Sequence, residues 1–352
     1  GSEMSEADMR GSDTTTDTTT DTTDRAPDAP AARRASALTG LLAPASGLLL
    51  VLLLALVTTP GFYQPEVLAL VLFQVGLIGV TALGQTAVLL VGGIDLSVGA
   101  VVGLTTVIVA SYAEGADARL GTAVGLALAA GVLVGAVNAG LVLLRRVPPF
   151  VATFATFVLV QGAITAWTRG APAGAIPPRL APLGTGRVFE VPVPAWLFAA
   201  LALVLGVLLA RSGFGRRVYA TGANRAATTL SGVRTGWVIT TCYLGCAAFA
   251  VLGGLVNAGY LGYVDARLSH DLDLNSIAAS VIGGVALTGG RGRIGQTVAG
   301  VLLLATLLTW LVRLGAGPGA QLVVEGAVIL VAVWLRNTRW AARRNRAGEG
   351  AR

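Results

Sequence analysis

Long stretches without a single charged side chain most constrain how this chain can fold. Residues 38–57 and 298–312 contain no Asp, Glu, Lys or Arg. A helix that crosses a membrane needs about 20 mostly apolar residues, because hydrocarbon offers the backbone no hydrogen-bond partner. Charged residues make up 12% of the chain, about half of the roughly 25% found in a soluble domain. The sequence therefore predicts an all-α polytopic membrane protein.

Ten segments are apolar enough to be predicted as transmembrane helices. They are residues 38–57, 66–90, 98–113, 120–144, 150–167, 195–210, 237–256, 275–287, 297–312 and 321–335. With the N-terminus inside, and apart from the distant Arg10, the predicted inner segments contain 18 arginines and the outer loops 6. Because cytoplasmic loops carry the excess of basic residues, both termini are predicted to be cytoplasmic.

The regions around these spans differ in composition. Residues 1–37 are polar and rich in Thr, Asp, Pro and Ala, which predicts a disordered cytoplasmic tail. Residues 38–337 are predicted to form the transmembrane domain, with a long cytoplasmic stretch at 211–236. Residues 338–352 are predicted to be a basic cytoplasmic tail.

Residue types that are absent or rare exclude several functions. The chain has no lysine, so it has no phosphate-binding loop of the G-x-x-x-x-G-K-[ST] type, and another subunit must bind any ATP that drives it. His270 is the only histidine, and Cys242 and Cys246 are interpreted as small buried apolar residues. We therefore expect no metal site and no cofactor in this chain. Its arginines lie in loops between apolar spans, which argues against a nucleic-acid partner.

The segment Gly92–Gly99 breaks an otherwise apolar region with three glycines, a carboxylate and a hydroxyl. Irregular backbone at membrane depth is tolerated only where protein or water satisfies its polar groups. A carboxylate there is a candidate functional residue. Asp95 and Ser97 open the third predicted span, where both residue types cap helices. The alternatives are direct contact with substrate and a contact that forms a gate.

A second break at Gly283–Gly290 repeats the pattern G-G-x-x-L-[S/T]-x-G of the first break. Transporters with internal repeats often place interrupted segments at corresponding positions in their two halves. Ala286 stands where the first break has Asp95. Residues 289–295 are predicted to face the cytoplasm.

The cytoplasmic stretch contains one predicted short helix, residues 224–230. Asn224 is its expected N-cap, and Gly232 is its expected stop. Small residues along this helix would let a partner protein approach the backbone closely. The alternative is an ordinary inner loop.

Four motifs occur in order along the chain. They are G-G-I-D-L-S-V-G-A at 92–100, N-A-G at 138–140 with P-P-F-V-A-T at 148–153, F-G-R at 214–216 with G-A-N-R-A-A at 222–227, and I-A-A at 277–279 with G-G-R-G-R at 289–293. Together they resemble the permease subunits of ribose/xylose/arabinose-type ATP-binding-cassette (ABC) importers, a family that includes sugar and autoinducer-2-like systems. The resemblance covers residues 60–337.

This resemblance implies a type II-importer-like permease that crosses the bacterial inner or plasma membrane many times. It implies a second permease copy, identical or different, and one or two ATPase subunits, which are often one tandem chain and bind ATP and Mg²⁺. An extracytoplasmic binding protein would deliver a monosaccharide or similar small polyol. The motif at the cytoplasmic stretch implies ATPase contacts at Gly222, Ala223, Asn224, Arg225, Ala226, Ala227, Ser231 and Gly232.

The expected substrate pathway or gate contains both polar and aromatic residues. These candidates are Gln85, Asp95, Ser97, Asn138, Phe150 and Glu325. Glu325 stands in the last span where the resembling permeases often carry lysine. Glu325 could reach water at the outer interface, pair with Arg313 or Arg267, or relay protons. The last possibility fits the alternative function, an ion-coupled secondary carrier without an ATPase.

The outer loops 168–194 and 257–274 are expected to cover the outer mouth and to dock the binding protein. The first is rich in Gly and Pro, and the second mixes aromatic and charged residues. For the second loop, the alternative is a solvated loop with aromatic residues at the lipid interface.

Overall fold

The structure is a computed structural model that describes residues 29–171, 174–263, 271–331 and 334, with the backbone alone for residues 29–40. The chain divides into two units, residues 1–38 and 39–352, and the second contains the helical bundle. The predictions of a disordered tail at 1–28 and a basic tail at 338–352 lie outside the described residues.

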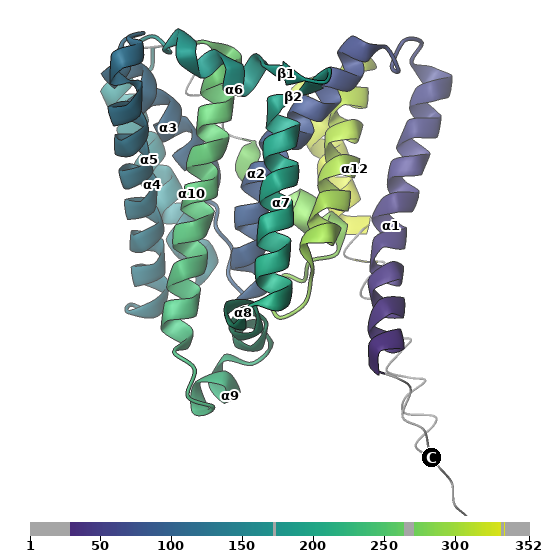
Figure 1. Ribbon diagram of the computed structural model, residues 1–352, viewed down its shortest axis with the longest axis vertical. Helices are drawn as coiled ribbons and strands as arrows, with labels where there is room; N and C mark the ends of the chain where they lie inside the picture. Colours follow the sequence, from purple (N-terminus) through teal and green to yellow (C-terminus); the bar gives the residue numbers. More distant parts are fainter. Residues whose placement is uncertain (1–28, 172–173, 264–270, 332–333, 335–352) are drawn as a thin grey trace, which may run out of the picture. The chain divides into compact units, whose positions relative to one another are not determined.

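Each of the ten predicted spans overlaps a helix, although the eighth, 275–287, was predicted to extend past the end of α11 at Gly283 into the second break. The helices are α1 Ala29–Thr58, α2 Pro65–Leu90, α3 Val98–Ala113, α4 Leu120–Leu143, α5 Pro149–Thr168, α7 Val193–Arg211, α10 Thr235–Leu261, α11 Leu272–Gly283, α12 Ile294–Arg313 and a final helix Pro318–Val331 (Figure 1). Within the described residues, seven helices are long and apolar enough to cross a membrane, and α3, α11 and the final helix are shorter.

The first helix begins earlier than predicted. The sequence places the first span at residues 38–57, whereas α1 starts at Ala29. Residues 29–37 contain mainly Ala and Arg, which have high helix propensity and extend the helix beyond the apolar run. The predicted end of the last span at residue 335 cannot be compared, because residues 332, 333 and 335 lie outside the described part of the chain.

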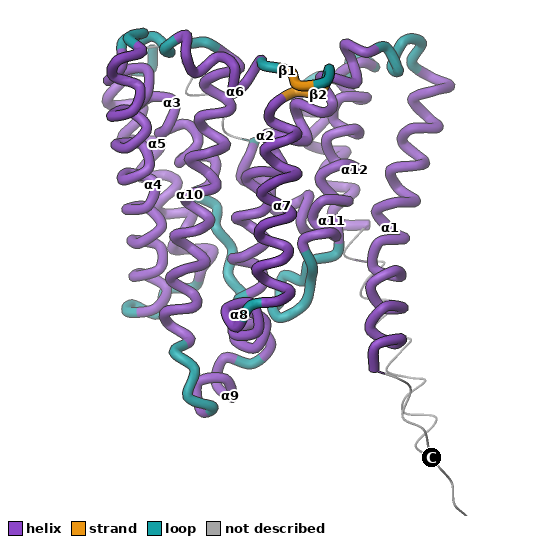
Figure 2. The backbone as a smooth tube through the Cα atoms, viewed as in Figure 1, coloured by secondary structure: helices purple, strands orange, loops and turns teal. Residues whose placement is uncertain are grey.

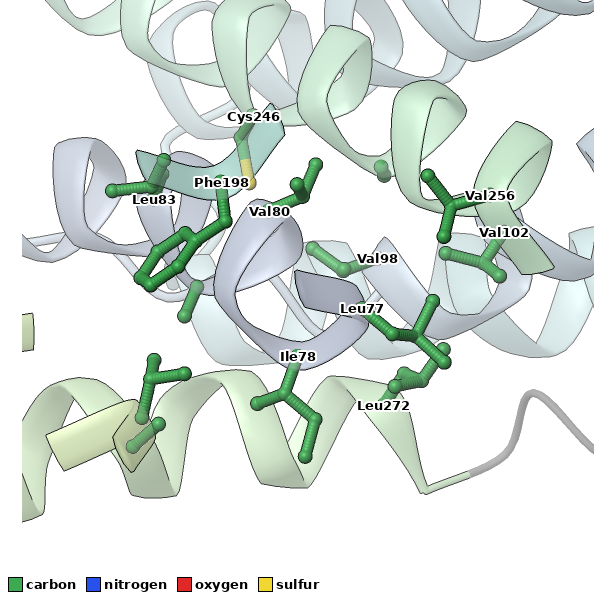
Figure 3. Close-up of a cluster of buried hydrophobic side chains, with 14 of the residues drawn as sticks. Leu77, Ile78, Val80, Leu83, Val98, Val102, Phe198, Cys246, Val256 and Leu272 are labelled. Carbon is green, nitrogen blue, oxygen red and sulfur yellow. The ribbon is translucent and has the colours of Figure 1, made fainter. Parts of the chain in front are cut away.

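Helix α2 is the centre of the bundle. It packs against α7, α10, α11 and α12, and 78% of its most apolar stretch is buried, compared with 17% for α1. Figure 3 shows part of the surrounding core, in which side chains of α2 meet those of α3, α7, α10 and α11. The labelled side chains are Leu77, Ile78, Val80, Leu83, Val98, Val102, Phe198, Cys246, Val256 and Leu272. A helix that is apolar on all sides is suited to this central position.

One end of the bundle carries a small antiparallel hairpin, which the all-α prediction did not include. Strands β1 Arg187–Val188 and β2 Val191–Pro192 pair Arg187 with Pro192 and Val188 with Val191 (Figure 2). The two turn residues, Phe189 and Glu190, have φ of 50° and 63°, as a type I′ turn requires. We call this end the hairpin end. The 3-10 helix η1 Asp117–Arg119 lies in the connection from α3 to α4, and η2 Pro178–Leu180 and α6 Ala181–Thr185 precede the hairpin.

The opposite end carries two short helices, α8 Gly213–Ala223 and α9 Arg225–Leu230 (Figure 1). We call it the α8–α9 end. Helix α9 matches the predicted short helix, with Asn224 as its N-cap: the Asn224 side chain accepts from the Ala227 amide at 2.9 Å. Helix α8 was not predicted, because its glycines are poor helix formers. Ser212 signals it locally, since its hydroxyl accepts from the Gly215 amide at 3.0 Å and caps the helix.

The two glycine-rich breaks meet each other and the end of α8. The Gly290 amide donates to the Leu90 carbonyl at 2.9 Å. A Cβ on Gly222 would overlap this carbonyl, and a Cβ on Gly289 would crowd the backbone of Gly92. We call these five residues, Leu90, Gly92, Gly222, Gly289 and Gly290, the glycine junction. Its backbones approach closely because no side chains separate them.

Replacing Gly222 with alanine should destabilise the protein. Overpacking at a closely packed site costs about 1–3 kcal/mol, and the new methyl group would overlap the Leu90 carbonyl oxygen. We expect Gly222→Ala to lower the midpoint of thermal unfolding in detergent by several degrees.

The matched control is Gly162→Ala on the exposed face of α5, where a Cβ meets nothing within 4 Å. It should leave the unfolding midpoint unchanged or slightly higher, because alanine favours helix. Equal midpoints for the two variants would contradict close packing at the junction.

Candidate functional site

The first break begins where α2 ends in a left-handed glycine. Gly92 has φ +80°. Its amide donates to Leu89 at 2.9 Å, and the Gly93 amide donates to Val88 at 3.0 Å. This is the Schellman arrangement, which satisfies the last carbonyls of a helix. Gly93 also lies against the hydroxyl of Tyr243, where a side chain would not fit. The sequence therefore ends α2 locally and leaves residues 93–97 to form a non-helical segment.

Asp95 is the centre of a buried set of hydrogen bonds. Its Oδ1 accepts from the Ser97 amide at 2.9 Å and from the Ser97 hydroxyl at 2.6 Å. From α4, the Asn138 side-chain amide donates to the Ser97 hydroxyl at 2.9 Å and more weakly to Asp95 at 3.4 Å. Asp95 is only 1% exposed. A carboxylate this deeply buried depends on such donors, because burying it without them is costly.

Helix α5 completes this set with two threonines. The Thr156 hydroxyl donates to Asn138 Oδ1 at 2.6 Å. The Thr153 hydroxyl lies 3.2 Å from the backbone carbonyl of Ile94, to which it donates. Thr153 is the last residue of the P-P-F-V-A-T motif, but the sequence did not indicate that Thr153 and Thr156 face the break.

Gln85 of α2 holds the break from the other side. With its amide oriented to satisfy both groups, Gln85 donates to the Asp95 backbone carbonyl at 3.0 Å and accepts from the Asp95 amide at 3.2 Å. We call Gln85, Asp95, Ser97, Asn138, Thr153 and Thr156 the Asp95 network. It joins four elements, namely α2, the break, α4 and α5. Four of the six predicted pathway or gate residues therefore lie together.

The capping role expected for Asp95 and Ser97 takes a different form. Ser97 is the N-cap of α3, but its side chain makes no capping hydrogen bond to the helix. Its hydroxyl is held by Asp95 and Asn138 instead. Asp95 thus fixes the residue at which the helix begins, rather than capping the helix directly.

Phe150 and Glu325 are not part of this network. Phe150 is exposed on α5, and its ring stacks on Phe154 with centroids 6.1 Å apart. Glu325 is 5% exposed, which argues against the alternative in which its side chain reaches water. It forms no ion pair with Arg313 among the described residues, and Arg267 lies outside them.

Glu325 lies within electrostatic reach of the Asp271 and Asp273 carboxylates. Nevertheless, the described residues contain no group of three or more His, Cys, Asp or Glu placed to hold a metal ion.

A second buried polar cluster was not predicted. The Thr86 hydroxyl of α2 lies 2.7 Å from the Thr297 hydroxyl of α12 and 3.1 Å from the Ser280 hydroxyl of α11. All three are buried. These hydroxyls join the central helix to the two helices on either side of the second break.

Most residues predicted to contact an ATPase are exposed at the α8–α9 end. They are Ala223, Asn224, Arg225, Ala226, Ala227, Ser231 and Gly232. Gly222 differs because it packs in the glycine junction. Tyr219 adds a further link from α8, since its hydroxyl donates to the Gly292 carbonyl at 2.9 Å. Burial raises the pKa of Tyr219 above its ordinary value, which keeps this hydroxyl protonated as a donor.

Comparison with known proteins identifies the family. Residues 67–333 match the family described as branched-chain amino acid transport system / permease component. The chain belongs to this permease family. The matched region runs from α2 to the final helix and contains both breaks, the Asp95 network, α8 and α9. The family is one of transport components, and the family resemblance predicted from the four motifs is confirmed.

Several curated permeases are similar over most of their length. The ribose import permease protein RbsC of Escherichia coli K12 is 36% identical over 296 residues, which cover 82% of this chain and 92% of that protein. RbsC of Bacillus subtilis 168 is 36% identical over 297 residues, covering 84% and 92%. The autoinducer 2 import system permease protein LsrC of Yersinia pestis Pestoides F is 32% identical over 286 residues, covering 81% of each chain. No solved structure matches this chain.

Removing the Asp95 carboxylate should destabilise this permease strongly. Asp95→Ala leaves the Ser97 amide without its acceptor inside the bundle, and a buried unsatisfied donor costs about 1–3 kcal/mol. Asp95→Asn keeps one acceptor oxygen and should lose less. Thermal unfolding in detergent measures both effects.

Glu114→Ala is the control for this series. Glu114 forms an exposed ion pair with Arg119 at 3.1 Å, and an exposed pair contributes at most about 1 kcal/mol. If Asp95→Ala unfolds no earlier than Glu114→Ala, the network does not hold the break.

Proposed function

We propose that this chain is the permease subunit of an ABC importer that moves a monosaccharide or similar small polyol into the cell. The substrate class comes from the similarity to the ribose and autoinducer 2 import permeases. The observation that carries the mechanism is the glycine junction, which joins α8 to both helix breaks. A force applied to the α8–α9 end would therefore reach both interrupted segments of the bundle.

The α8–α9 end is proposed to face the cytoplasm, with ten spans and both chain termini inside. Nine described arginines lie at this end: Arg145, Arg146, Arg211, Arg216, Arg217, Arg225, Arg234, Arg291 and Arg293. The only described acid there is Asp95, which is buried. Five described arginines lie at the hairpin end, together with acids such as Glu66, Glu114 and Glu190. This asymmetry is typical of a positively charged cytoplasmic side.

Helix α9 is proposed to dock on an ATPase subunit, which would bind ATP and Mg²⁺. Leu230 at its end is 90% exposed, and Ala226 and Ala227 leave the helix backbone accessible. The exposed Leu230 and the accessible backbone beside it would give an ATPase an apolar contact and a close approach to the helix. The assembled complex would be an ATP-hydrolysing translocase, while this chain supplies the path.

The hairpin end is proposed to receive the extracytoplasmic binding protein. Phe189 in the hairpin turn is also 90% exposed. Helix α6, which precedes the hairpin, packs against α10, where Gly184 lies directly on the Tyr260 backbone. Docking at this surface would be transmitted along α10, which contacts α2, α3 and α4.

Transport is proposed to proceed by alternating access in a pair of permeases, either two copies of this chain or two related chains. Closure of the ATPases would move α9 and α8, and the glycine junction would pass this movement to the breaks. The Asp95 network would keep α3, α4 and α5 together as one body during the movement. Exposed aromatic residues on α5, including Phe150 and Phe154, are candidates for the face toward the second permease.

The buried carboxyl of Glu325 favours one alternative, an ion-coupled secondary carrier. Its Oε1 has no hydrogen-bond partner within the described part of the chain, and intramembrane acids often relay protons. Proteoliposomes distinguish the two functions. The importer requires the ATPase and ATP for sugar accumulation, whereas accumulation by this chain alone on an ion gradient would establish the carrier.

Leu230→Asn and Phe189→Asn form a matched pair of variants. Both side chains are equally exposed and project from opposite ends of the bundle. We expect Leu230→Asn to reduce co-purification of the ATPase about tenfold and leave binding-protein docking intact, because the ATPase is proposed to meet the α8–α9 end and not the hairpin end. Phe189→Asn should have the reverse effect. The proposed orientation would be contradicted if Leu230→Asn weakened binding-protein docking and Phe189→Asn weakened co-purification of the ATPase.

Labelling of an introduced cysteine tests the topology directly. Ser231 is exposed next to α9, and the native Cys242 and Cys246 are buried, so background labelling should be low. We expect Ser231→Cys to react with a membrane-impermeant maleimide in inside-out vesicles and not in intact cells. Labelling from outside intact cells would overturn the cytoplasmic assignment of α8 and α9.

A further inference from the structure

A cavity of about 430 Å³ opens at the α8–α9 end, between α8 and the first turn of α10. Its lining includes Arg217 of α8 together with Arg234 and Trp237 at the start of α10. The turn at Ser231 and Gly232 also lines it. This cavity is separate from the Asp95 network, and none of these side chains belongs to that network.

Among the described residues that line it, the cavity has two arginines and no acid. Neither Arg217 nor Arg234 forms an ion pair within the described residues. The described acid at this end of the bundle, Asp95, is buried and already accepts hydrogen bonds from Ser97. Two guanidinium groups at one opening therefore favour an anion, and their fork of N–H donors fits phosphate oxygens well.

The aromatic side chains place this cavity at the level of lipid headgroups. Trp237 is exposed in the first turn of α10 and makes an edge-to-face contact with Phe214, with ring centroids 5.9 Å apart. Helix α10 is long and apolar enough to cross the membrane. Tryptophan at the end of such a helix is typical of the membrane–water interface. Helix α9 lies farther from the bundle than α8 does (Figure 1). Its Leu230 is exposed.

We propose that this cavity binds the phosphate of an anionic phospholipid, such as phosphatidylglycerol. The two arginines would hold the phosphate, and Trp237 would lie beside the glycerol and the upper acyl chains. A zwitterionic lipid fits less well, because its own cation would face Arg217 and Arg234. Basic pockets at the cytoplasmic side of transmembrane helices bind anionic headgroups in this way.

Such a lipid would also brace the segment that carries α9. Arg217 belongs to α8 and Arg234 to the start of α10, so one phosphate would bridge the two ends of the α8–α9 segment. The inference rests on the proposed position of this end at the membrane surface, but it requires neither sugar transport nor the ATPase.

Thermal unfolding of the full chain in nanodiscs tests the site. Nanodiscs of phosphatidylcholine are compared with nanodiscs containing phosphatidylglycerol, for the parent protein and for the double variant Arg217→Gln/Arg234→Gln. We expect phosphatidylglycerol to raise the unfolding midpoint of the parent by several degrees and that of the double variant by less than a third as much. Native mass spectrometry should show about tenfold weaker retention of phosphatidylglycerol by the double variant, because two cationic contacts are lost.

Arg145→Gln is the matched control. Arg145 is an exposed arginine at the same end but outside the cavity, so its variant should keep the full lipid effect. An equal loss in this control would show general attraction to the anionic surface and overturn the site. The double variant should unfold like the parent in phosphatidylcholine, since both replaced side chains are exposed.

Two further measurements separate other occupants. If millimolar inorganic phosphate stabilises the parent in phosphatidylcholine as strongly as phosphatidylglycerol does, the cavity binds a soluble phosphate and the lipid assignment is wrong. If the double variant keeps the lipid effect but loses co-purification of the ATPase, the cavity is a protein contact and the assignment is also wrong. Failure of sugar uptake alone would bear on the proposed function and not on this site.

Discussion

The hydrogen bond from the Gly290 amide to the Leu90 carbonyl links the two interrupted parts of the bundle. Non-helical backbone in an apolar setting must find its hydrogen-bond partners within the protein. Here the Gly290 amide of the second break donates to the Leu90 carbonyl at the end of α2, next to the first break, so each group gains a hydrogen-bond partner. The glycines allow the two backbones to approach. Gly222 brings the end of α8 to the same point. The segment outside the bundle is thereby joined to the segments inside it.

The Asp95 network supplies hydrogen-bond partners for the rest of the first break, residues 93–97. The segment between α2 and α3 carries a carboxylate and a hydroxyl, and α4 and α5 supply Asn138 and Thr156 to satisfy them. Because a partly satisfied buried network is costly, these contacts favour one arrangement of three helices. A moving permease benefits from such a unit, since the movement can then be confined to the boundaries between units.

The local features of the sequence predicted the local features of the fold. The long apolar runs located the ten helices that match the predicted spans, and Asn224 correctly marked the start of α9, since hydropathy and capping act over a few residues. Other features could not be predicted in this way. Helix α8 has low intrinsic propensity, and its packing against α7 and α10 stabilises it. The hairpin at 187–192 places non-glycine residues at positive φ, so its turn carries none of the usual sequence signals.

For the candidate site, the sequence determined which residues are chemically unusual, and the tertiary structure decided which of them act together. Gln85, Asp95, Ser97 and Asn138 stood out because polar groups are costly among apolar spans. Only the packing of α2, α4 and α5 around the break showed that these four meet, that Thr153 and Thr156 join them, and that Phe150 does not. Glu325 likewise stood out in the sequence, but its burial depends on neighbours that are distant along the chain. Hydropathy and charge are properties of short segments, whereas hydrogen-bond partnership requires segments far apart in sequence to be brought together.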